Sequence, residues 1–427
     1  MPVAVETGKT ADLPVTADRG RRFALILSGG GARGAYEAGV LSWILDDLPE
    51  RLGRPVHFDI LTGSSVGAIH ACYVAATMGE ARAGRRLINI WRTLQVSGVY
   101  RLGMGDVVGI PLRLLGIAPR PTMPPEAGIA QRLSGLLDTL PLERLVRERI
   151  PWTDLRRHVD EGTVEAVAVA ATEIGSGRSI VWVDNRGRAV QRWPHDPFVV
   201  ARSAVLEPRH ALASAAIPFL FPAPCIDGQY FCDGGLRLNT PLAPALRLGA
   251  DRLLIVGLRH VATPEEQATL AADREANYAS LAFLAGKVLN ALLLDHVDYD
   301  VDRLRLVNAI LDTGTRTYGP EFLTHINEAI EPLRGTPYKV VRNVYIRPSR
   351  DLGVIASECL AEHRRIRGVR AWLSDAMVRY AVHGIAAEAD LLSYLYFDRC
   401  YAEHLIELGR ADAEARADAF VAFFDES

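Results

Sequence analysis

The sequence predicts an α/β fold with a mostly parallel central sheet flanked by helices. Two consecutive units, between residues 22 and 78, each run from a short apolar segment through a glycine-containing turn into a helical pattern. Strand–turn–helix units that follow one another in this way favour a parallel sheet with helices on its faces. Hydrophobic residues make up 49% of the 427 residues and charged residues 23%, a globular composition that allows a sizeable core.

The first unit begins with "RFALIL" (Arg22–Leu27), an apolar run that ends at "SGGG" and is typical of a buried strand feeding a glycine turn. Apolar residues then recur at helical spacing between Ala35 and Leu48. The second unit begins with "FDIL" (Phe58–Leu61), which predicts another strand. The segment "VGAIHACYVAATM" (Val66–Met78) is apolar almost all round, so we expect a buried helix there, with Gly79 as its C-terminal stop.

The remainder of the chain adds a cap, further strands and a helical end. Tyr100–Glu126 is rich in Gly and Pro without a clean period, which favours a surface cap or loop. Two strand patterns separated by "GSGR" predict a hairpin. The strands expected here are Val164–Ile174 and Ser179–Asp184 of that hairpin, then Tyr230–Gly235, Asp251–Leu258 and Lys339–Ile346. From about Ala356 onward the pattern is helical and alanine-rich.

Charge and composition exclude several classes of protein. The net charge of −3 argues against a nucleic-acid binder. The five cysteines are too few and too dispersed for a disulfide framework or a zinc site, so we expect a reducing compartment and a cytoplasmic protein. Residues 1–20 form a polar tail, expected to be disordered, without the apolar core of a signal peptide. The most apolar long stretch, Tyr278–Val297, carries Lys287 near its middle and is expected to be an amphipathic or buried helix rather than a membrane span.

Ser65 is the candidate nucleophile, because Gly63-Ser64-Ser65-Val66-Gly67 fits the pattern G-x-S-x-G. In this pattern the serine occupies a tight strand-to-helix turn, and only small neighbours leave room for it. The helix that begins there directs its positive dipole end and free N–H groups at developing negative charge. The alternative is a serine that caps the helix in a glycine turn, which suits the same residues.

The second glycine motif, Gly29-Gly30-Gly31-Ala32-Arg33-Gly34, fits G-x-G-x-x-G between a strand and a helix. A dinucleotide-binding fold would use this string to approach a pyrophosphate, but it would need an acidic residue at the end of the next strand, where this chain has Thr62. If Ser65 is a nucleophile, the amides of Gly30 and Gly31 are natural donors to an oxyanion. One interpretation then uses both motifs.

Asp233 is the candidate base, since a serine nucleophile needs one. It ends the "YFCD" strand and is followed by Gly234 and Gly235, which permit close backbone approach. The alternative is an ordinary Asp-Gly turn. His70 lies five residues into the helix of Ser65 and is rotated by roughly 140° from it, so we expect a helix histidine with a structural role.

Taken together and in this order, "SGGGARGAYEAGVL", "GSSVG" and "DGG" resemble the oxyanion loop, nucleophile elbow and catalytic aspartate of patatin-like phospholipases. "ALASAAIPFLFPAP" and "RLNTPLAPALRLGAD" on either side of the aspartate extend the similarity. The resemblance implies a three-layer α/β/α fold and a serine–aspartate dyad that hydrolyses lipid acyl esters without calcium or another cofactor. It assigns Ser65 as nucleophile, Asp233 as base and Gly29, Gly30 and Gly31 as the oxyanion loop. The supporting motif positions are Arg33, Gly34, Gly63, Gly67, Gly234 and Gly235. One departure is minor: Ser28 stands where many members have Asp.

The resemblance also predicts the domain organisation and the partners. Residues 21–258 would form the patatin-like domain, and residues 259–427 an α-rich region that partly completes the fold. The expected substrate is a lipid ester, with transient contact to a membrane surface and no nucleic acid. "GIPLRLLGIAP" (Gly109–Pro119) and "IPFLFPAP" (Ile217–Pro224) could form an apolar entrance to the site, or could pack in the core.

No metal site is expected. "DYDVD" (Asp298–Asp302) departs from a calcium loop, because Arg303 stands where the turn glycine belongs and Ala309 where the bidentate glutamate belongs. These acids are expected on a solvated helix face.

Two other functions fit parts of the sequence. A Ser–Asp–His hydrolase would use His260, just after "LLIVGL", as its base, although that fold places more strands before the elbow than the two found here. A catalytically silent module that binds lipid or a protein partner would also use the apolar stretches. The preferred hypothesis is a two-step acyl transfer through an acyl-enzyme on Ser65.

Overall fold

A computed structural model of the protein describes residues 21–100, 132–133, 137–186, 193, 198–265, 297–367 and 389–425. The predicted polar tail, the apolar segment Gly109–Pro119 and all of Tyr278–Val297 except its last residue lie outside the described residues. In the described ranges, none of the helices has the length and apolarity needed to cross a membrane.

The centre of the molecule is one sheet with the strand order β10-β9-β1-β2-β4-β8-β7-β3, and β5 and β6 extend it beside β4. Neighbouring strands from β10 to β4 all run parallel, whereas β4, β8, β7 and β3 pair antiparallel. The parallel strands are β1 (Phe23–Leu27), β2 (Ile60–Ser64), β4 (Ala166–Glu173), β9 (Arg252–Val256) and β10 (Arg342–Ile346). The others are β3 (Arg132–Leu133), β5 (Ser179–Asn185), β6 (Val199–Ser203), β7 (Ala223–Ile226) and β8 (Gln229–Asp233).

Strand β1 shows why the sheet needs helices on both faces. All five of its residues are buried. Leu25 and Leu27 point into one hydrophobic cluster, and Ala24 and Ile26 point into a second cluster on the other face. A strand buried on both faces has to be apolar throughout, as "FALIL" is, and this is typical of parallel sheets. The predicted α/β fold with a mostly parallel central sheet is therefore confirmed.

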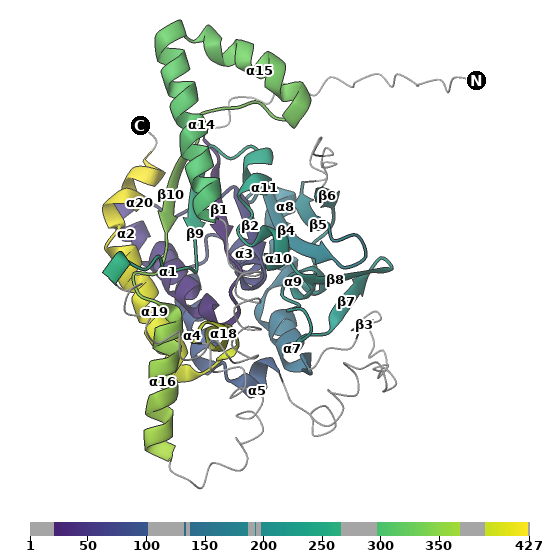
Figure 1. Ribbon diagram of the computed structural model, residues 1–427, viewed down its shortest axis with the longest axis vertical. Coiled ribbons are helices and arrows are strands. Elements are labelled where there is room, and N and C mark those ends of the chain that lie inside the picture. The colour runs from purple at the N-terminus through teal and green to yellow at the C-terminus, as the bar shows by residue number, and fades with distance from the viewer. Residues whose placement is uncertain are drawn as a thin grey trace, which may run out of the picture.

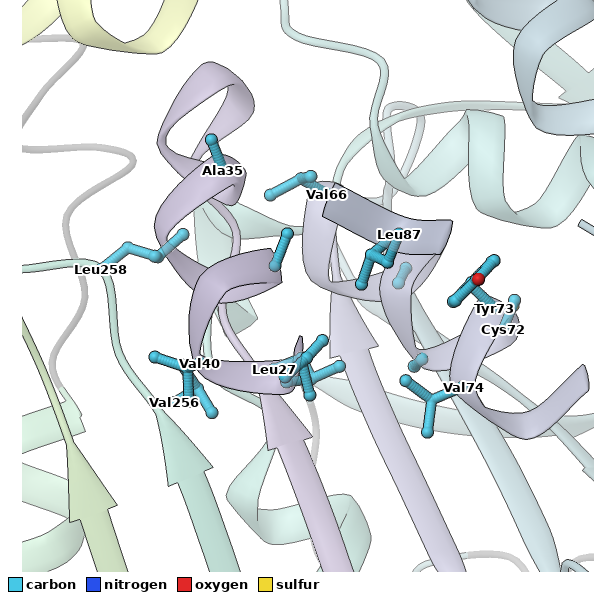
Figure 2. Packing of buried hydrophobic residues seen from close by; sticks show 14 of the residues in the cluster. Leu27, Ala35, Val40, Val66, Cys72, Tyr73, Val74, Leu87, Val256 and Leu258 are labelled. Atoms are coloured by element: carbon cyan, nitrogen blue, oxygen red, sulfur yellow. The ribbon is translucent and has the colours of Figure 1, made fainter. Parts of the chain in front are cut away.

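Helices cover the two faces of the sheet (Figure 1). One cluster contains side chains of α1, α3, α4 and α19, and the other contains side chains of α11 and α14. Figure 2 shows Leu27, Val40 and Val256 packed together between α1 and the strands.

The helices of the first half are η1 (Gly31–Arg33), α1 (Gly34–Asp46), α2 (Leu48–Leu52), α3 (Val66–Ala76), α4 (Ala83–Thr93), α5 (Val96–Val99), α7 (Leu140–Arg149), α8 (Trp152–Glu161) and α9 (Pro208–Ser214). Those of the second half are α10 (Gly235–Leu238), α11 (Leu242–Arg247), α14 (Val297–Tyr318), α15 (Glu321–Arg334), α16 (Leu352–Arg367), α18 (Ala389–Leu395), α19 (Arg399–Glu414) and α20 (Ala417–Phe424).

The predicted elements are found with small shifts at their ends. The hairpin is β4 paired antiparallel with β5. Helix α3 ends at Ala76, three residues before Gly79, and the Thr77 amide donates to the carbonyl oxygens of Tyr73 and Val74. Gly79, the predicted stop, has a positive φ of 78° but lies three residues beyond the last residue of the helix.

The C-terminal region contributes to the same core as the N-terminal part. Strand β10 pairs with β9, and α19 packs along α1. Their backbones approach closely, because a Cβ on Gly39 would lie 2.9 Å from the Ile406 Cα atom and one on Gly409 would lie 3.0 Å from the Val40 nitrogen. Residues more than 360 positions apart in the sequence therefore share one helix–helix contact.

The cysteines are dispersed along the sequence, but the fold brings one pair of them together. Cys359 of α16 and Cys400 of α19 have their sulfur atoms 2.8 Å apart, although 41 positions separate them in the sequence. The two helices pack against each other, which brings the thiols together.

Candidate active site

Ser65 lies at the junction of β2 and α3, in the strand–turn–helix position that the motif predicts. Its backbone has φ 53° and ψ −126°, a left-handed conformation that side chains rarely adopt. A Cβ on Gly63 would come within 2.6 Å of the Ala68 nitrogen, and one on Gly67 within 2.6 Å of the Leu27 carbonyl carbon. The two motif glycines are therefore required by close backbone approach at the turn.

Asp233 contacts Ser65 directly. The Ser65 hydroxyl donates to Asp233 Oδ2 at 2.6 Å, and the Gly235 amide donates to Oδ1 at 2.7 Å. Strand β8 ends at Asp233 and pairs with β4, and Thr172 of β4 donates its hydroxyl to the Asp233 carbonyl oxygen at 3.0 Å. The structure brings together two residues that are 168 positions apart in the sequence. Their catalytic roles stay predictions.

The surroundings of Asp233 make its carboxyl a better base than a free aspartate. The residue is 2% exposed. Burial raises the pKa of Asp233 from its ordinary 3.8 to about 6, while the hydrogen bonds from Ser65 and Gly235 act in the opposite direction. A carboxylate with a pKa of about 6 remains ionised at neutral pH and binds a proton more readily than an exposed aspartate.

Ser214 is a further site residue that the sequence reasoning did not single out. Its hydroxyl accepts a hydrogen bond from the Ser65 amide at 2.8 Å and donates to the Ala170 carbonyl oxygen at 2.5 Å. This side chain ties the turn of Ser65 to β4. The available signal was its place in "ALASAAIPFLFPAP", one of the stretches that carried the family resemblance.

The glycine loop faces the same small cavity as Ser65 and Asp233. The Gly29 amide donates to the Asn239 carbonyl oxygen at 3.2 Å, so this amide is already engaged. Within the part of the chain that the structure describes, the amides of Gly30 and Gly31 donate no hydrogen bond. They remain the candidate oxyanion donors of the loop.

Helix α18 covers the glycine loop, which the sequence did not indicate. Gly31 has φ +55°, and the backbone of Tyr394 occupies the place of a Cβ at this position. Arg33 is 4% exposed and donates from Nε to the Ser393 hydroxyl at 2.7 Å. Its guanidinium also lies over the Tyr394 ring, 4.2 Å from the centroid. Arg33 thus joins the loop to a segment 360 positions further along the chain.

The remaining motif glycines lie against the same elements. A Cβ on Gly34 would come within 2.5 Å of Val66 Cγ2, so the start of α1 packs on the start of α3. A Cβ on Gly234 would come within 2.5 Å of the Ser64 hydroxyl oxygen. Gly34 and Gly234 therefore pack closely against residues that adjoin Ser65 in the sequence.

Comparison with known proteins decides the family. The sequence profile of the patatin-like phospholipases matches residues 25–246, just over half of the chain. This range contains the glycine loop, the elbow and Asp233. The chain belongs to the patatin-like phospholipase family.

One curated relative of this patatin-like chain is a cGAMP-activated phospholipase of Pseudomonas aeruginosa (strain BWHPSA011 / Pa011). The two are 29% identical over 222 residues, which are 51% of this chain and 53% of the relative, so the match spans about half the length of each protein.

Two solved structures of bacterial proteins also match this chain at low sequence identity. VipD from Legionella pneumophila has a TM-score of 0.28 at 14% identity, over 95% of this chain and 75% of VipD. Full-length ExoU in complex with SpcU, from Pseudomonas aeruginosa, has a TM-score of 0.28 at 15% identity, over 88% of this chain and 70% of that one.

An apolar cavity is lined in part by Ser65, the candidate nucleophile. Its lining also includes Gly31, Ile217, Phe221 and Phe397. Helices α3, α4 and α7 supply most of the remaining wall: Val66, Ile69, Tyr73, Leu87, Ile90, Trp91, Leu142, Leu145 and Val146. Such a lining suits a hydrocarbon chain.

The histidines considered from the sequence are engaged with other groups, although His70 also lines the apolar cavity. His70 is 2% exposed, accepts a hydrogen bond from Trp91 Nε1 at 2.9 Å, and has Nδ1 3.4 Å from Glu37 Oε1. This is the structural role expected for it. His260 has Nδ1 3.1 Å from the Pro348 carbonyl oxygen. A carboxylate, that of Asp233, occupies the position against the Ser65 hydroxyl where a histidine base would have to lie.

The acidic segment that was compared with a calcium loop is part of helix α14. Asp298 pairs with Arg347 at 3.2 Å, and Asp302 pairs with Arg305 at 3.0 Å. These carboxylates are engaged in ion pairs on a helix surface.

Proposed function

We propose that the protein is a serine lipid acyl hydrolase, in which Ser65 is the nucleophile and Asp233 the base. The observation that carries the proposal is the 2.6 Å hydrogen bond from the Ser65 hydroxyl to the buried Asp233 carboxylate, next to an apolar cavity that Ser65 helps to line. The family assignment supports hydrolysis of lipid esters by the chain as a whole.

The reaction would proceed in two steps. As Ser65 Oγ attacks the ester carbonyl carbon, its proton passes to Asp233 Oδ2 and the carbonyl oxygen becomes an oxyanion. The amides of Gly30 and Gly31 and the N-terminal end of α3 would stabilise that charge, and each such donor contributes roughly 2.7–4 kcal/mol in comparable sites. The proton on Asp233 then goes to the leaving alcohol. In the second step, water attacks the carbonyl carbon of the acyl-enzyme, Asp233 accepts a proton from the water, and that proton returns to Ser65 Oγ as the acid is released.

The cavity supports a long acyl chain as the group that is transferred. Its wall is formed mostly by aliphatic and aromatic side chains, many of them from three helices, and Ser65 is among the residues that line it. A chain placed there would bring its carbonyl group to the Ser65 hydroxyl.

Contact with a membrane surface is a further part of the proposal. Phe219 is 78% exposed and has a φ of 66°, so the backbone holds an aromatic side chain out into solvent. Its neighbours Ile217 and Phe221 are buried and line the apolar cavity. The segment therefore connects an exposed aromatic tip with the cavity beside Ser65, which suits entry of a lipid from a surface.

Hydrolysis of p-nitrophenyl esters and of phospholipid vesicles tests the proposal. Ser65→Ala and Asp233→Asn should each lower the rate by a factor of about 10³ or more, because each removes a group that acts in the bond-making step. Ser64→Ala is the matched control, since Ser64 is the adjacent buried serine and its hydroxyl has no hydrogen-bond partner.

Labelling with a fluorophosphonate probe distinguishes this proposal from a silent lipid-binding module. Labelling of the wild-type protein and of Ser64→Ala, but not of Ser65→Ala, is the expected result. A wild-type protein that is folded, binds lipid and takes up no label would contradict the hydrolase.

A further inference from the structure

Outside the catalytic site, the Cys359–Cys400 pair brings two reactive side chains within reach of each other. Their sulfur atoms are 2.8 Å apart, less than 1 Å longer than a disulfide bond of about 2.05 Å. Both cysteines are free in the structure. We propose that Cys359 and Cys400 form a reversible disulfide, and that this bond restrains the segment that covers the glycine loop.

The exposure of the two thiols gives them different roles. Cys359 is 2% exposed, whereas Cys400 is partly exposed in the first turn of α19. Burial raises the pKa of both thiols, that of Cys359 strongly. Raised pKa values lower the thiolate fraction of both residues, so access decides the order: an oxidant reaches the more exposed Cys400 first, and Cys359 is the partner that completes the bond.

The oxidant we infer is a peroxide. The Cys400 sulfur attacks one peroxide oxygen, the O–O bond breaks, and the products are a sulfenic acid on Cys400 and water. The Cys359 sulfur then attacks the sulfenic sulfur, the S–O bond breaks, and the oxygen leaves as a second water molecule with the Cys359 proton. The two cysteines lose two electrons in total, and the peroxide gains them.

A metal site made from the same residues fits the geometry less well. His404 Nδ1 lies 3.6 Å and 3.7 Å from the two sulfurs, so the three side chains could approach one ion. However, two thiolates bound to a tetrahedral zinc ion at about 2.3 Å would be roughly 3.8 Å apart, which is longer than the observed separation. His404 Nδ1 also lies 2.9 Å from the Cys400 carbonyl oxygen, a position that suits an N–H donor.

The position of Cys400 connects the pair to the proposed catalytic site. Phe397, three residues before Cys400, lines the apolar cavity and stacks on Trp91 with ring centroids 6.2 Å apart. Tyr394, one turn earlier, lies against Gly31 and Arg33. Ser65 is only 5% exposed, so a lipid can reach it only if covering side chains move. A bond from Cys400 to α16 would resist that movement.

Intact-mass measurement of the full chain before and after peroxide treatment tests the disulfide itself. We expect a loss of about 2 Da and a tryptic product that joins the peptides of Cys359 and Cys400, both reversed by dithiothreitol. Cys400→Ser and Cys359→Ala should abolish the cross-link. Cys225→Ser should not, since Cys225 is a partly exposed thiol on a different element, β7.

Two further measurements test the restraint. The disulfide closes a loop of 41 positions and should raise the melting temperature of the wild-type protein by several degrees. A second expectation rests on the proposed function. Oxidation should slow hydrolysis of a long-chain ester by the wild-type protein about threefold or more, and it should leave the rate of Cys400→Ser unchanged.

Several outcomes would overturn the proposal. The first is the absence of the cross-link after oxidation. The second is binding of one equivalent of zinc by the wild-type protein but not by Cys400→Ser. The third is a cross-link that changes neither the melting temperature nor the rate of hydrolysis. Failure of the reduced wild-type protein to hydrolyse any ester would count against the hydrolase alone, because mass and melting temperature do not depend on activity.

Discussion

Asp233 is held in surroundings that oppose its negative charge, and this sets the pH range in which it can act as a base. Its pKa of about 6 means that the carboxyl is protonated below that pH and cannot accept the Ser65 proton. We expect kcat/KM for a neutral ester to rise about tenfold per pH unit up to pH 6 and to level off above it. A profile measured on a p-nitrophenyl ester that stays flat down to pH 4.5 would contradict this assignment.

The same buried charge should reduce the stability of the protein. A carboxyl whose pKa is raised on folding binds its proton more tightly in the folded state, so stability falls as pH rises from about 4 through 6. The shift corresponds to about 3 kcal/mol above pH 6, an order-of-magnitude value. Asp233→Asn, which removes the charge and keeps the shape, should therefore melt at a higher temperature than wild type at pH 8.

That stability difference should disappear in acid. At pH 4 the wild-type carboxyl is neutral, so Asp233→Asn and the wild type should melt at similar temperatures. Thermal unfolding of both proteins at pH 4 and pH 8 measures this directly. A lower melting temperature for the variant at pH 8 would show that the ionised carboxylate contributes net stabilisation through Ser65 and Gly235.

At the scale of the elements, the start of α3 depends on a neighbouring helix for its shape. The Ser65 amide and the Ala170 carbonyl oxygen are joined through the Ser214 hydroxyl of α9. Ser214→Ala would leave both backbone groups buried without this partner, at a cost of about 1–3 kcal/mol each. We expect a lower melting temperature and at least a tenfold loss of kcat, while Ser64→Ala, which breaks no hydrogen bond, changes neither. Equal behaviour of the two variants would contradict the role of Ser214.

The elements that build the site could be predicted because their signals are local. A run such as "FALIL" is buried on both faces, and the glycines on either side of Ser65 stand within two positions of it in the sequence, although Gly67 makes its close backbone approach to Leu27 of β1. Asp233 ends a strand and precedes two glycines, a pattern that equally fits an Asp-Gly turn, and the family resemblance decided between the two interpretations. Ser214 has no comparable pattern around it, since a serine in an alanine-rich helix looks the same whether or not it braces a turn.

At the scale of the whole molecule, contacts between distant segments explain what the sequence did not reveal. Ser393 and Tyr394 cover a loop about 360 positions away, and Cys359 meets Cys400 across two helices. Periodicity describes one element at a time and does not state which elements meet. The α-rich character of the C-terminal region was therefore predictable, whereas its place against Gly31 and Arg33 was not.

Access of lipid to the cavity is a property of the whole molecule, and Phe219 allows it to be tested. A charged residue at this exposed position should weaken contact with a membrane without disturbing the buried Ser65–Asp233 pair. We expect Phe219→Asp to lower the rate of phospholipid-vesicle hydrolysis about fivefold or more. The rate of hydrolysis of a short soluble ester should stay within about a factor of two of the wild-type rate. Vesicle flotation should show the same loss of binding.

The matched control for this prediction is Tyr318→Asp, because Tyr318 is 75% exposed but lies at the end of α14. Replacing a comparably exposed aromatic side chain there changes surface charge and hydrophobicity by similar amounts. If both variants lose vesicle activity equally, the effect comes from overall charge rather than from the segment beside the cavity. If neither does, lipid reaches Ser65 by another route, and the apolar tip of Phe219 has no part in binding the surface.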